Sequence, residues 1–207
     1  MYRLFIDRLL VGNSQSEWVI GFSDASYSDQ RWCKGELFPG NEISQARDEA
    51  YELTGICHSN GEWLAVLSQT GGNTLQRWKI TEYFPYDAIQ DNWNEGYKID
   101  RLVFANEQWL AVFSRSNPAC LQRWFITESF PDREINQGWD EGYQVDDLIY
   151  GNGQWVVVMK TSAEPGLQRW HLEDVLPRGQ IEQGWTDGYR ITQVAFGNNR
   201  WAVILSR

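Results

Sequence analysis

One arginine recurs four times in this sequence within the segment Gln-Arg-Trp, and it is the residue type best suited to ionic chemistry. The four are Arg31, Arg77, Arg123 and Arg169. An acidic residue also recurs, always two residues before a tyrosine: Glu49, Glu95, Glu141 and Asp187. Because a guanidinium binds a carboxylate through two parallel hydrogen bonds, the pattern predicts a repeated bidentate ion pair. These pairs either hold the repeated units together or form a ring of arginines that binds anionic groups.

A set of tryptophans flanked by polar residues is the second candidate for binding. It consists of Trp93, Trp139 and Trp185. An indole ring near a rim can be a platform for a ligand, whereas an indole turned inward only packs. Both interpretations stay open, and with the arginines this set would line equivalent pockets in a ligand-binding ring.

The segments before each Leu-Gln-Arg-Trp differ most between copies. They cover residues 69–74, 116–120 and 161–166, and their candidates for partner contact are Asn73, Asn117 and Glu164. Repeat scaffolds often carry function where the copies disagree, and these loops are expected at one end of the array. Drift in tolerant surface loops is the alternative.

Residues typical of catalytic and metal sites are sparse. The two histidines, His58 and His171, fall at different points of the repeat, and no His-x-x-His or Cys-x-x-Cys spacing occurs. There is no nucleophile elbow, and no glycine-rich phosphate loop or kinase motif. The sequence therefore predicts no metal, no cofactor and no enzymatic activity.

The charge balance restricts the class of partner. The net charge is −10 and lysine and arginine form no cluster, which argues against nucleic acid and anionic membranes. No apolar run of about 18 residues exists, and Met1 to Arg8 carries charges where a signal peptide needs apolar residues. The three cysteines are an odd number at no fixed repeat position, so free thiols and a cytoplasmic location are expected.

A single period organises the whole chain. The tryptophan of each Gln-Arg-Trp lies 46 residues after the previous one, at Trp32, Trp78, Trp124 and Trp170. The other eight tryptophans fall into two further sets with nearly the same step. One domain over residues 1–207 is therefore predicted, with units starting near residues 2, 51, 97, 143 and 189, the last incomplete.

Each unit reads as three strands and a helix. Two β-type runs flank a Gly-Asn-Gly turn at residues 151–153, which predicts a tight hairpin. The second run, from Trp155, is apolar on both faces and predicts a strand covered on both sides. A third strand contains Leu-Gln-Arg-Trp. Pro131 then predicts a helical turn or two that ends near Gly142, with a short strand around Trp139 as the competing interpretation.

These elements predict an all-β fold with short helical turns. Small sheets at this period favour a five-unit, β-propeller-like ring, and an open stack of β-β-β-α repeats is the alternative. With five hairpins but four Gln-Arg-Trp strands, the last hairpin is expected to lack its third strand. We expect the first unit to close the ring against it; a second copy or a partner strand are the alternatives.

The repeat resembles a tryptophan-rich region known from other proteins. The resemblance is carried by Tyr143, residues 151–153, Trp155, residues 130–131 and Trp139. It is similar to the region C-terminal to plant casein-kinase-1-like nuclear kinases, and to repeats in cyanobacterial serine/threonine kinases and caspase-like proteins. That resemblance implies an accessory sensing or binding module. The arginine of the Gln-Arg-Trp segments departs from the usual pattern of that region.

The function predicted from the sequence is non-catalytic binding. The divergent loops favour recognition of a protein partner on one face. A propeller-type lectin or small-ligand binder, with repeated tryptophan and arginine pockets, is the alternative.

Overall fold

The computed structural model describes residues 5–12, 17–23, 27–71, 74–115, 120–162 and 166–207, with side chains from residue 27 onward. This part of the chain is mainly β, with short helices, as the sequence predicts. It forms four three-stranded antiparallel sheets and one two-stranded sheet.

Every sheet contains one hairpin. The hairpins are β1 (Phe5–Gly12) with β2 (Glu17–Ser23), β4 (Glu52–Ser59) with β5 (Glu62–Ser68), β7 (Tyr97–Ala105) with β8 (Gln108–Arg115), β10 (Tyr143–Gly151) with β11 (Gln154–Thr161), and β13 (Arg190–Gly197) with β14 (Arg200–Ser206). The predicted turn at residues 152–153 is present, and both residues have positive φ, of 50° and 78°.

The Gln-Arg-Trp segments form the third strands, which we call the outer strands. They are β3 (Gln30–Gly35), β6 (Gln76–Thr81), β9 (Gln122–Thr127) and β12 (Gln168–Glu173). Each pairs with the second strand of the hairpin that follows it in the chain, so the sheet orders are β3-β5-β4, β6-β8-β7, β9-β11-β10 and β12-β14-β13.

The helices connect each outer strand to its own hairpin. They are α1 (Gly40–Asp48), α2 (Tyr86–Asn94), α3 (Asp132–Asp140) and α4 (Arg178–Thr186). Each begins directly after a proline, and α3 ends before Gly142, which has a φ of 80°. The helix predicted after Pro131 is confirmed, and the competing strand around Trp139 is wrong.

The assignment of third strands differs from the sequence-based expectation. The last hairpin, β13–β14, has a third strand, β12, and within the described residues the two-stranded sheet is β1–β2. The prediction that the last hairpin lacks its third strand is therefore wrong. The physical reason lies in the connections, because β9 and β10 run parallel in one sheet and parallel strands need a long crossover, which α3 supplies. The shorter loop after β11 only leads to the next sheet.

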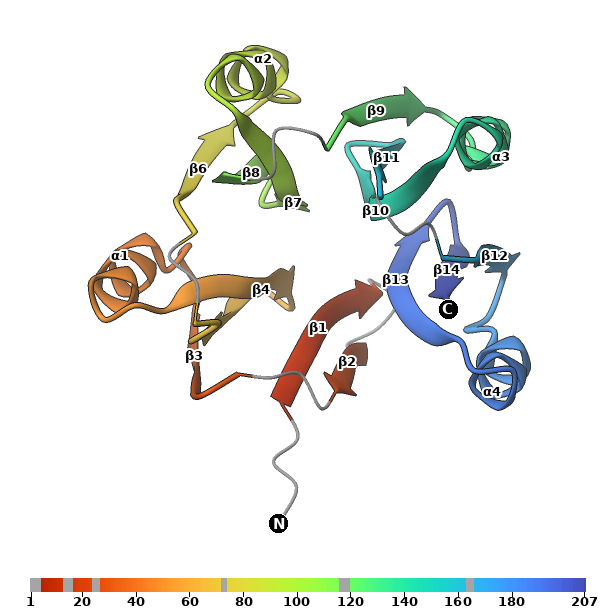
Figure 1. Ribbon diagram of the computed structural model, residues 1–207, viewed down its shortest axis with the longest axis horizontal. Coiled ribbons are helices and arrows are strands. Elements are labelled where there is room, and N and C mark those ends of the chain that lie inside the picture. The colour runs from red at the N-terminus through yellow and green to blue at the C-terminus, as the bar shows by residue number, and fades with distance from the viewer. Residues whose placement is uncertain (1–4, 13–16, 24–26, 72–73, 116–119, 163–165) are drawn as a thin grey trace.

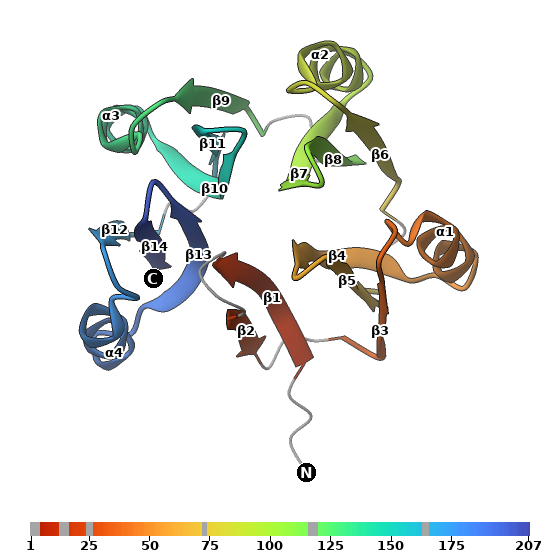
Figure 2. The same cartoon turned by 180° about the vertical axis from the view of Figure 1, so that it is seen from behind.

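The five sheets stand around a central axis, with the first strand of each hairpin innermost and the helices at the periphery (Figures 1 and 2). The innermost strands contact one another in the order β1, β4, β7, β10, β13, and β13 returns to β1. The first and last hairpins of the chain are therefore neighbours, and the units form a circle rather than a line.

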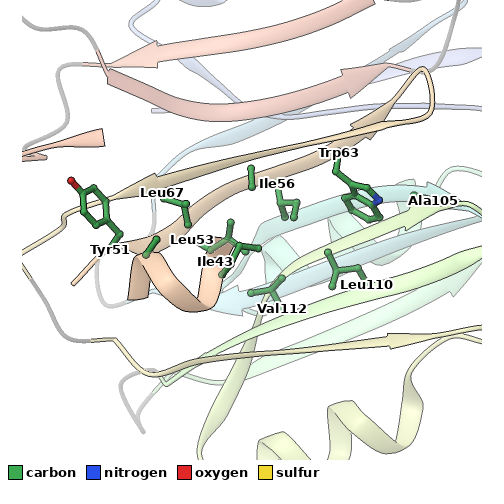
Figure 3. Close-up of a cluster of buried hydrophobic side chains, with 11 residues drawn as sticks. Ile43, Tyr51, Leu53, Ile56, Trp63, Leu67, Ala105, Leu110 and Val112 are labelled. Carbon is green, nitrogen blue, oxygen red and sulfur yellow. The ribbon is translucent and has the colours of Figure 1, made fainter. Parts of the chain in front are cut away.

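The core lies between neighbouring sheets. In the cluster of Figure 3, Trp63 and Leu67 of β5 face Leu110 and Val112 of β8, and Ile43 of α1 closes one side. The next strand of this type, β11, contributes to two such clusters. Its residues 155, 157 and 159 enter one, and residues 156 and 158 enter the other. The prediction that this strand is covered on both faces is confirmed.

Candidate functional site

The glutamines of β6, β9 and β12 bind the backbone of the preceding unit. The N–H of Ile99 donates to Gln122 Oε1 at 2.8 Å, and Gln122 Nε2 donates to the Ile99 carbonyl at 2.8 Å. Gln76 makes the same pair of bonds to Leu53, at 2.8 and 3.0 Å. Because β4 and β7 are edge strands of their sheets, these backbone groups have no strand beside them. The side-chain amide replaces that missing strand, and we call this contact the glutamine bridge.

The polar-flanked tryptophans join the glutamine bridges. Trp93 Nε1 donates to Gln122 Oε1 at 3.2 Å, and Trp139 Nε1 donates to Gln168 Oε1 at 3.0 Å. Trp93 and Trp139 are half-buried between units, whereas Trp185 is 58% exposed. Two members of the set thus connect neighbouring units, and the third presents its ring to solvent.

The tryptophans of β6, β9 and β12 pack on the Phe-Pro segment of the unit before them. The ring centroids of Phe84 and Trp124 lie 5.1 Å apart, and those of Phe130 and Trp170 lie 5.2 Å apart. The prediction that Trp124 is wedged between units is confirmed. Trp32, at the first position of this series, is 65% exposed.

The repeated arginines act within their own units. Each binds the predicted acidic residue through Nη1 and one carboxylate oxygen. The N–O distances are 2.6 Å for Arg31–Glu49, 2.6 Å for Arg77–Glu95 and 3.2 Å for Arg169–Asp187, and Arg123 binds Glu141 in the same way. The predicted pairing is confirmed. The bidentate form is wrong for Arg123, whose Nε and Nη2 are buried without a hydrogen-bond partner among the described residues.

Each arginine also lies over a tyrosine at the start of the innermost strand. The distance from the guanidinium carbon to the ring centroid is 4.2 Å for Tyr51 and 3.9 Å for Tyr143. A hydrogen bond from Gln137, which has the larger effect, and one from Arg123 lower the pKa of Glu141. The arginine therefore ties the outer strand to the helix end and the hairpin of the same sheet.

An aromatic cleft lies between the last two three-stranded sheets, at the end where the hairpin turns lie, which we call the turn end. Its volume is about 460 Å³, and its lining includes Phe130, Trp155, Trp170, Asn198 and Arg200. A smaller cleft of about 90 Å³ occupies the equivalent place between the first two three-stranded sheets. At the larger cleft, Asn198 Oδ1 accepts a hydrogen bond from the Tyr150 hydroxyl at 2.6 Å.

Polar clefts lie at the opposite end of the same sheet interfaces. We call this the loop end, because the divergent segments enter the outer strands there. One cleft, of about 340 Å³, is lined by Glu52, Thr74, Asp100 and Arg101 among others.

The second polar cleft has about the same size, 330 Å³, but a different lining. It includes Asp146, Lys160, Gly166, Arg190 and Arg207. Lys160 is paired with Asp146 at 2.6 Å. The glutamines of the bridges line the inner part of both clefts.

A family model covers nearly the whole of this arrangement. The model of a domain of unknown function, DUF7477, matches residues 4–122 and again residues 112–207. The chain belongs to the DUF7477 family. No curated protein and no solved structure matches it. Each DUF7477 match spans more than one sheet, so the family describes the array rather than a single repeat.

The candidate loop residues of the DUF7477 array, Asn73, Asn117 and Glu164, lie outside the described residues. Their described neighbours border the polar clefts. The N–H of Thr74 donates to Glu52 Oε1 at 2.7 Å, and Gln144 Nε2 donates to the Gly166 carbonyl at 2.6 Å. The described ends of two divergent segments, Thr74 and Gly166, therefore line the polar clefts.

His58 and Cys57 of the DUF7477 array serve packing. His58 lies against the ring of Trp63, with centroids 5.1 Å apart, and burial lowers its pKa. Burial raises the pKa of the Cys57 thiol to about 12. In the described ranges, no three His, Cys, Asp or Glu side chains gather as they would around a metal ion. No helix in those ranges has the length and hydropathy to cross a bilayer.

Sequence reasoning missed the glutamine bridge. Its signal is nevertheless in the sequence, because a glutamine precedes the arginine in all four outer strands, at Gln30, Gln76, Gln122 and Gln168. The arginine forms an ion pair within its own unit, whereas the neighbouring glutamine makes the contact between units.

Proposed function

We propose that this DUF7477 array is a five-unit β-propeller that binds a protein partner at its loop end without catalysis. The propeller assignment is supported by five small sheets around one axis and by the cyclic contacts of the innermost strands. The outer strand, helix and hairpin of each sheet would then form one blade.

The observation that carries the binding proposal is the contrast between constant bridges and variable clefts. The glutamine bridge is chemically the same at each described interface between three-stranded sheets. The polar clefts around it differ in charge. One combines Glu52 and Asp100 with Arg101, whereas the other combines Arg190 and its basic neighbours with a single aspartate.

Variable clefts fit a protein surface better than a repeated small ligand. A ligand bound once per unit needs the same donors and acceptors at every interface, while a protein partner presents different groups to neighbouring clefts. The described ends of two divergent loops, Thr74 and Gly166, border these clefts. The resemblance to repeats attached to kinases and caspase-like proteins agrees with a role as an accessory module in signalling.

A non-catalytic role is supported by how the reactive side chains are used. The Cys57 thiol is held in its neutral form by burial, and a thiol rather than a thiolate is a poor nucleophile. His58 Nε2 is buried without a hydrogen-bond partner in the described part of the chain, so it contacts no acid or nucleophile there.

The test is a pair of charge reversals on exposed arginines of one sheet. Arg190→Glu alters the loop end, and Arg200→Glu alters the turn end. Proteins captured from the source cell are quantified by mass spectrometry, and thermal melts check folding. We expect Arg190→Glu to lose a partner that the parent and Arg200→Glu retain. Loss with Arg200→Glu alone would place the binding surface at the turn end and refute the proposal.

The aromatic cleft supports a second candidate, binding of a glycan or another small ligand. Its 460 Å³ lie within the range of ligand pockets, and aromatic rings beside an asparagine and an arginine suit a sugar. On a glycan array, this candidate predicts binding that Asn198→Ala abolishes and Arg190→Glu leaves intact.

A further inference from the structure

One sheet of the ring has an open edge. In the four three-stranded sheets, the second hairpin strand pairs with an outer strand, whereas in the described part of the chain nothing pairs with the corresponding edge of β2. Unpaired N–H and C=O groups along such an edge form a template for another strand. The β1–β2 hairpin otherwise takes its place in the ring, since β1 contacts β4 and β13.

Two exposed tryptophans belong to the units on either side of this incomplete sheet. Trp185 is in α4, of the unit before it in the ring, and Trp32 is in β3, of the unit after it; Figure 1 labels both elements. They are 58% and 65% exposed, while their described counterparts at the other interfaces are half-buried.

The counterparts show which contacts complete each interface. Trp139, the counterpart of Trp185, donates its N–H to the glutamine of the next outer strand. Trp78, the counterpart of Trp32, packs on Phe38, which follows the outer strand of the unit before it. Both kinds of contact would come from one outer strand and its Phe-Pro segment, placed at the edge of β2.

We propose that the open edge of β2 binds an extended segment of the Gln-Arg-Trp type from another polypeptide. The segment pairs with β2 as β9 pairs with β11, which uses six residues on each strand. Its glutamine binds the backbone of Ile191 and accepts from Trp185 Nε1. Its tryptophan packs near Leu176, and its Phe-Pro covers Trp32.

A second copy of the chain is a poorer occupant. Its four outer strands are each paired within their own sheets, so donating one would open another edge. A segment from a partner costs no such pairing. This site is separate from the loop-end clefts, and its test is independent of the proposed function.

The probe is a fluorescein-labelled peptide with the sequence of residues 121–131, Leu-Gln-Arg-Trp-Phe-Ile-Thr-Glu-Ser-Phe-Pro. Fluorescence anisotropy with the full chain should show saturable binding at one site. Replacing the peptide's glutamine by alanine should weaken binding about tenfold, the effect of losing one or two hydrogen bonds. Absence of saturable binding would overturn the proposal.

A matched pair of protein variants locates the site. Trp185→Phe keeps an aromatic ring but removes the N–H, and should weaken peptide binding by about fivefold to tenfold. Trp139→Phe makes the same change at an interface that is already complete, and should leave peptide binding unchanged. Equal effects of the two variants would overturn the proposal.

Two further outcomes identify a different occupant. Hydrogen exchange of Glu17–Ser23 should be fast at outward-facing amides of the free chain and slow with the peptide. Slow exchange in the free monomer would mean that the chain itself covers the edge. A dimer in sedimentation experiments that the peptide dissociates would mean that a second copy covers it. Either result overturns the proposal.

Discussion

Replacing Gln76 by alanine should destabilise the protein more than replacing the charged residue beside it. Gln76 is 8% exposed and makes four hydrogen bonds through its side chain. Two of them bind the N–H and C=O of Leu53, which is itself buried. Alanine leaves both backbone groups without a partner between two sheets.

The magnitude follows from those unpaired groups. An unsatisfied buried polar group costs about 1–3 kcal/mol, and partial access of water reduces this toward the lower end. For two such groups we expect the free energy of unfolding to fall by about 2–4 kcal/mol. Arg77→Gln should cost less, because both partners of the Arg77–Glu95 pair are about half exposed, at 47% and 57% of their side-chain area.

The assay is urea denaturation followed by tryptophan fluorescence. Gln90→Ala, in an exposed position of α2, is the matched control and should leave the midpoint nearly unchanged. The reasoning would be refuted if Gln76→Ala and Gln90→Ala had the same midpoint, or if Arg77→Gln were the most destabilising of the three.

Four other predictions follow from single residues. Trp124→Ala should lower the free energy of unfolding by about 3–5 kcal/mol, and a thermal melt that overlays the parent would contradict this. Ala50 follows α1 with a φ of 64°, at the position that Gly142 occupies after α3. Ala50→Gly should therefore stabilise the protein by about 1 kcal/mol, and Gly142→Ala should destabilise it by a similar amount. Melting shifts of the same sign for the two variants would contradict this. The Cys57 thiol, with its pKa raised to about 12, should resist iodoacetamide at pH 8 until the protein unfolds, as mass spectrometry can check. Burial lowers the pKa of His58, so on acidification the unfolded chain takes up a proton near pH 6.5, before the folded chain does, and stability should fall as the pH drops below that value. His58→Phe should weaken the pH dependence of the denaturation midpoint between pH 5 and 7. An unchanged pH dependence in this variant would contradict the prediction.

Local structure was predictable from the sequence because each element carries its own signal. The Asn-Gly turn at residues 152–153, the doubly apolar strand from Trp155 and the proline before α3 all act over a few residues. The pairing of arginine and acid was also predictable, because both recur at a fixed offset. The structure adds that Arg123 binds through one nitrogen only.

The assignment of strands to sheets was not predictable from the period alone. A repeat of 46 residues has no marked start, so β9 could belong with the hairpin before it or the hairpin after it. The deciding feature is the crossover through α3 between parallel strands, which requires knowing that β9 and β10 share a sheet. The glutamine bridge was hidden for a related reason, because its partner Ile99 lies in another unit.

Photocrosslinking locates the surface at which the protein partner binds. A photoreactive amino acid replaces Arg190 at the loop end or, as the matched control, Arg200 at the turn end, and the chain is irradiated in lysate of the source cell. The account predicts that one protein is crosslinked in high yield from position 190 and not from position 200. Crosslinking of that protein from position 200 alone, or equal crosslinking from both positions, would contradict it.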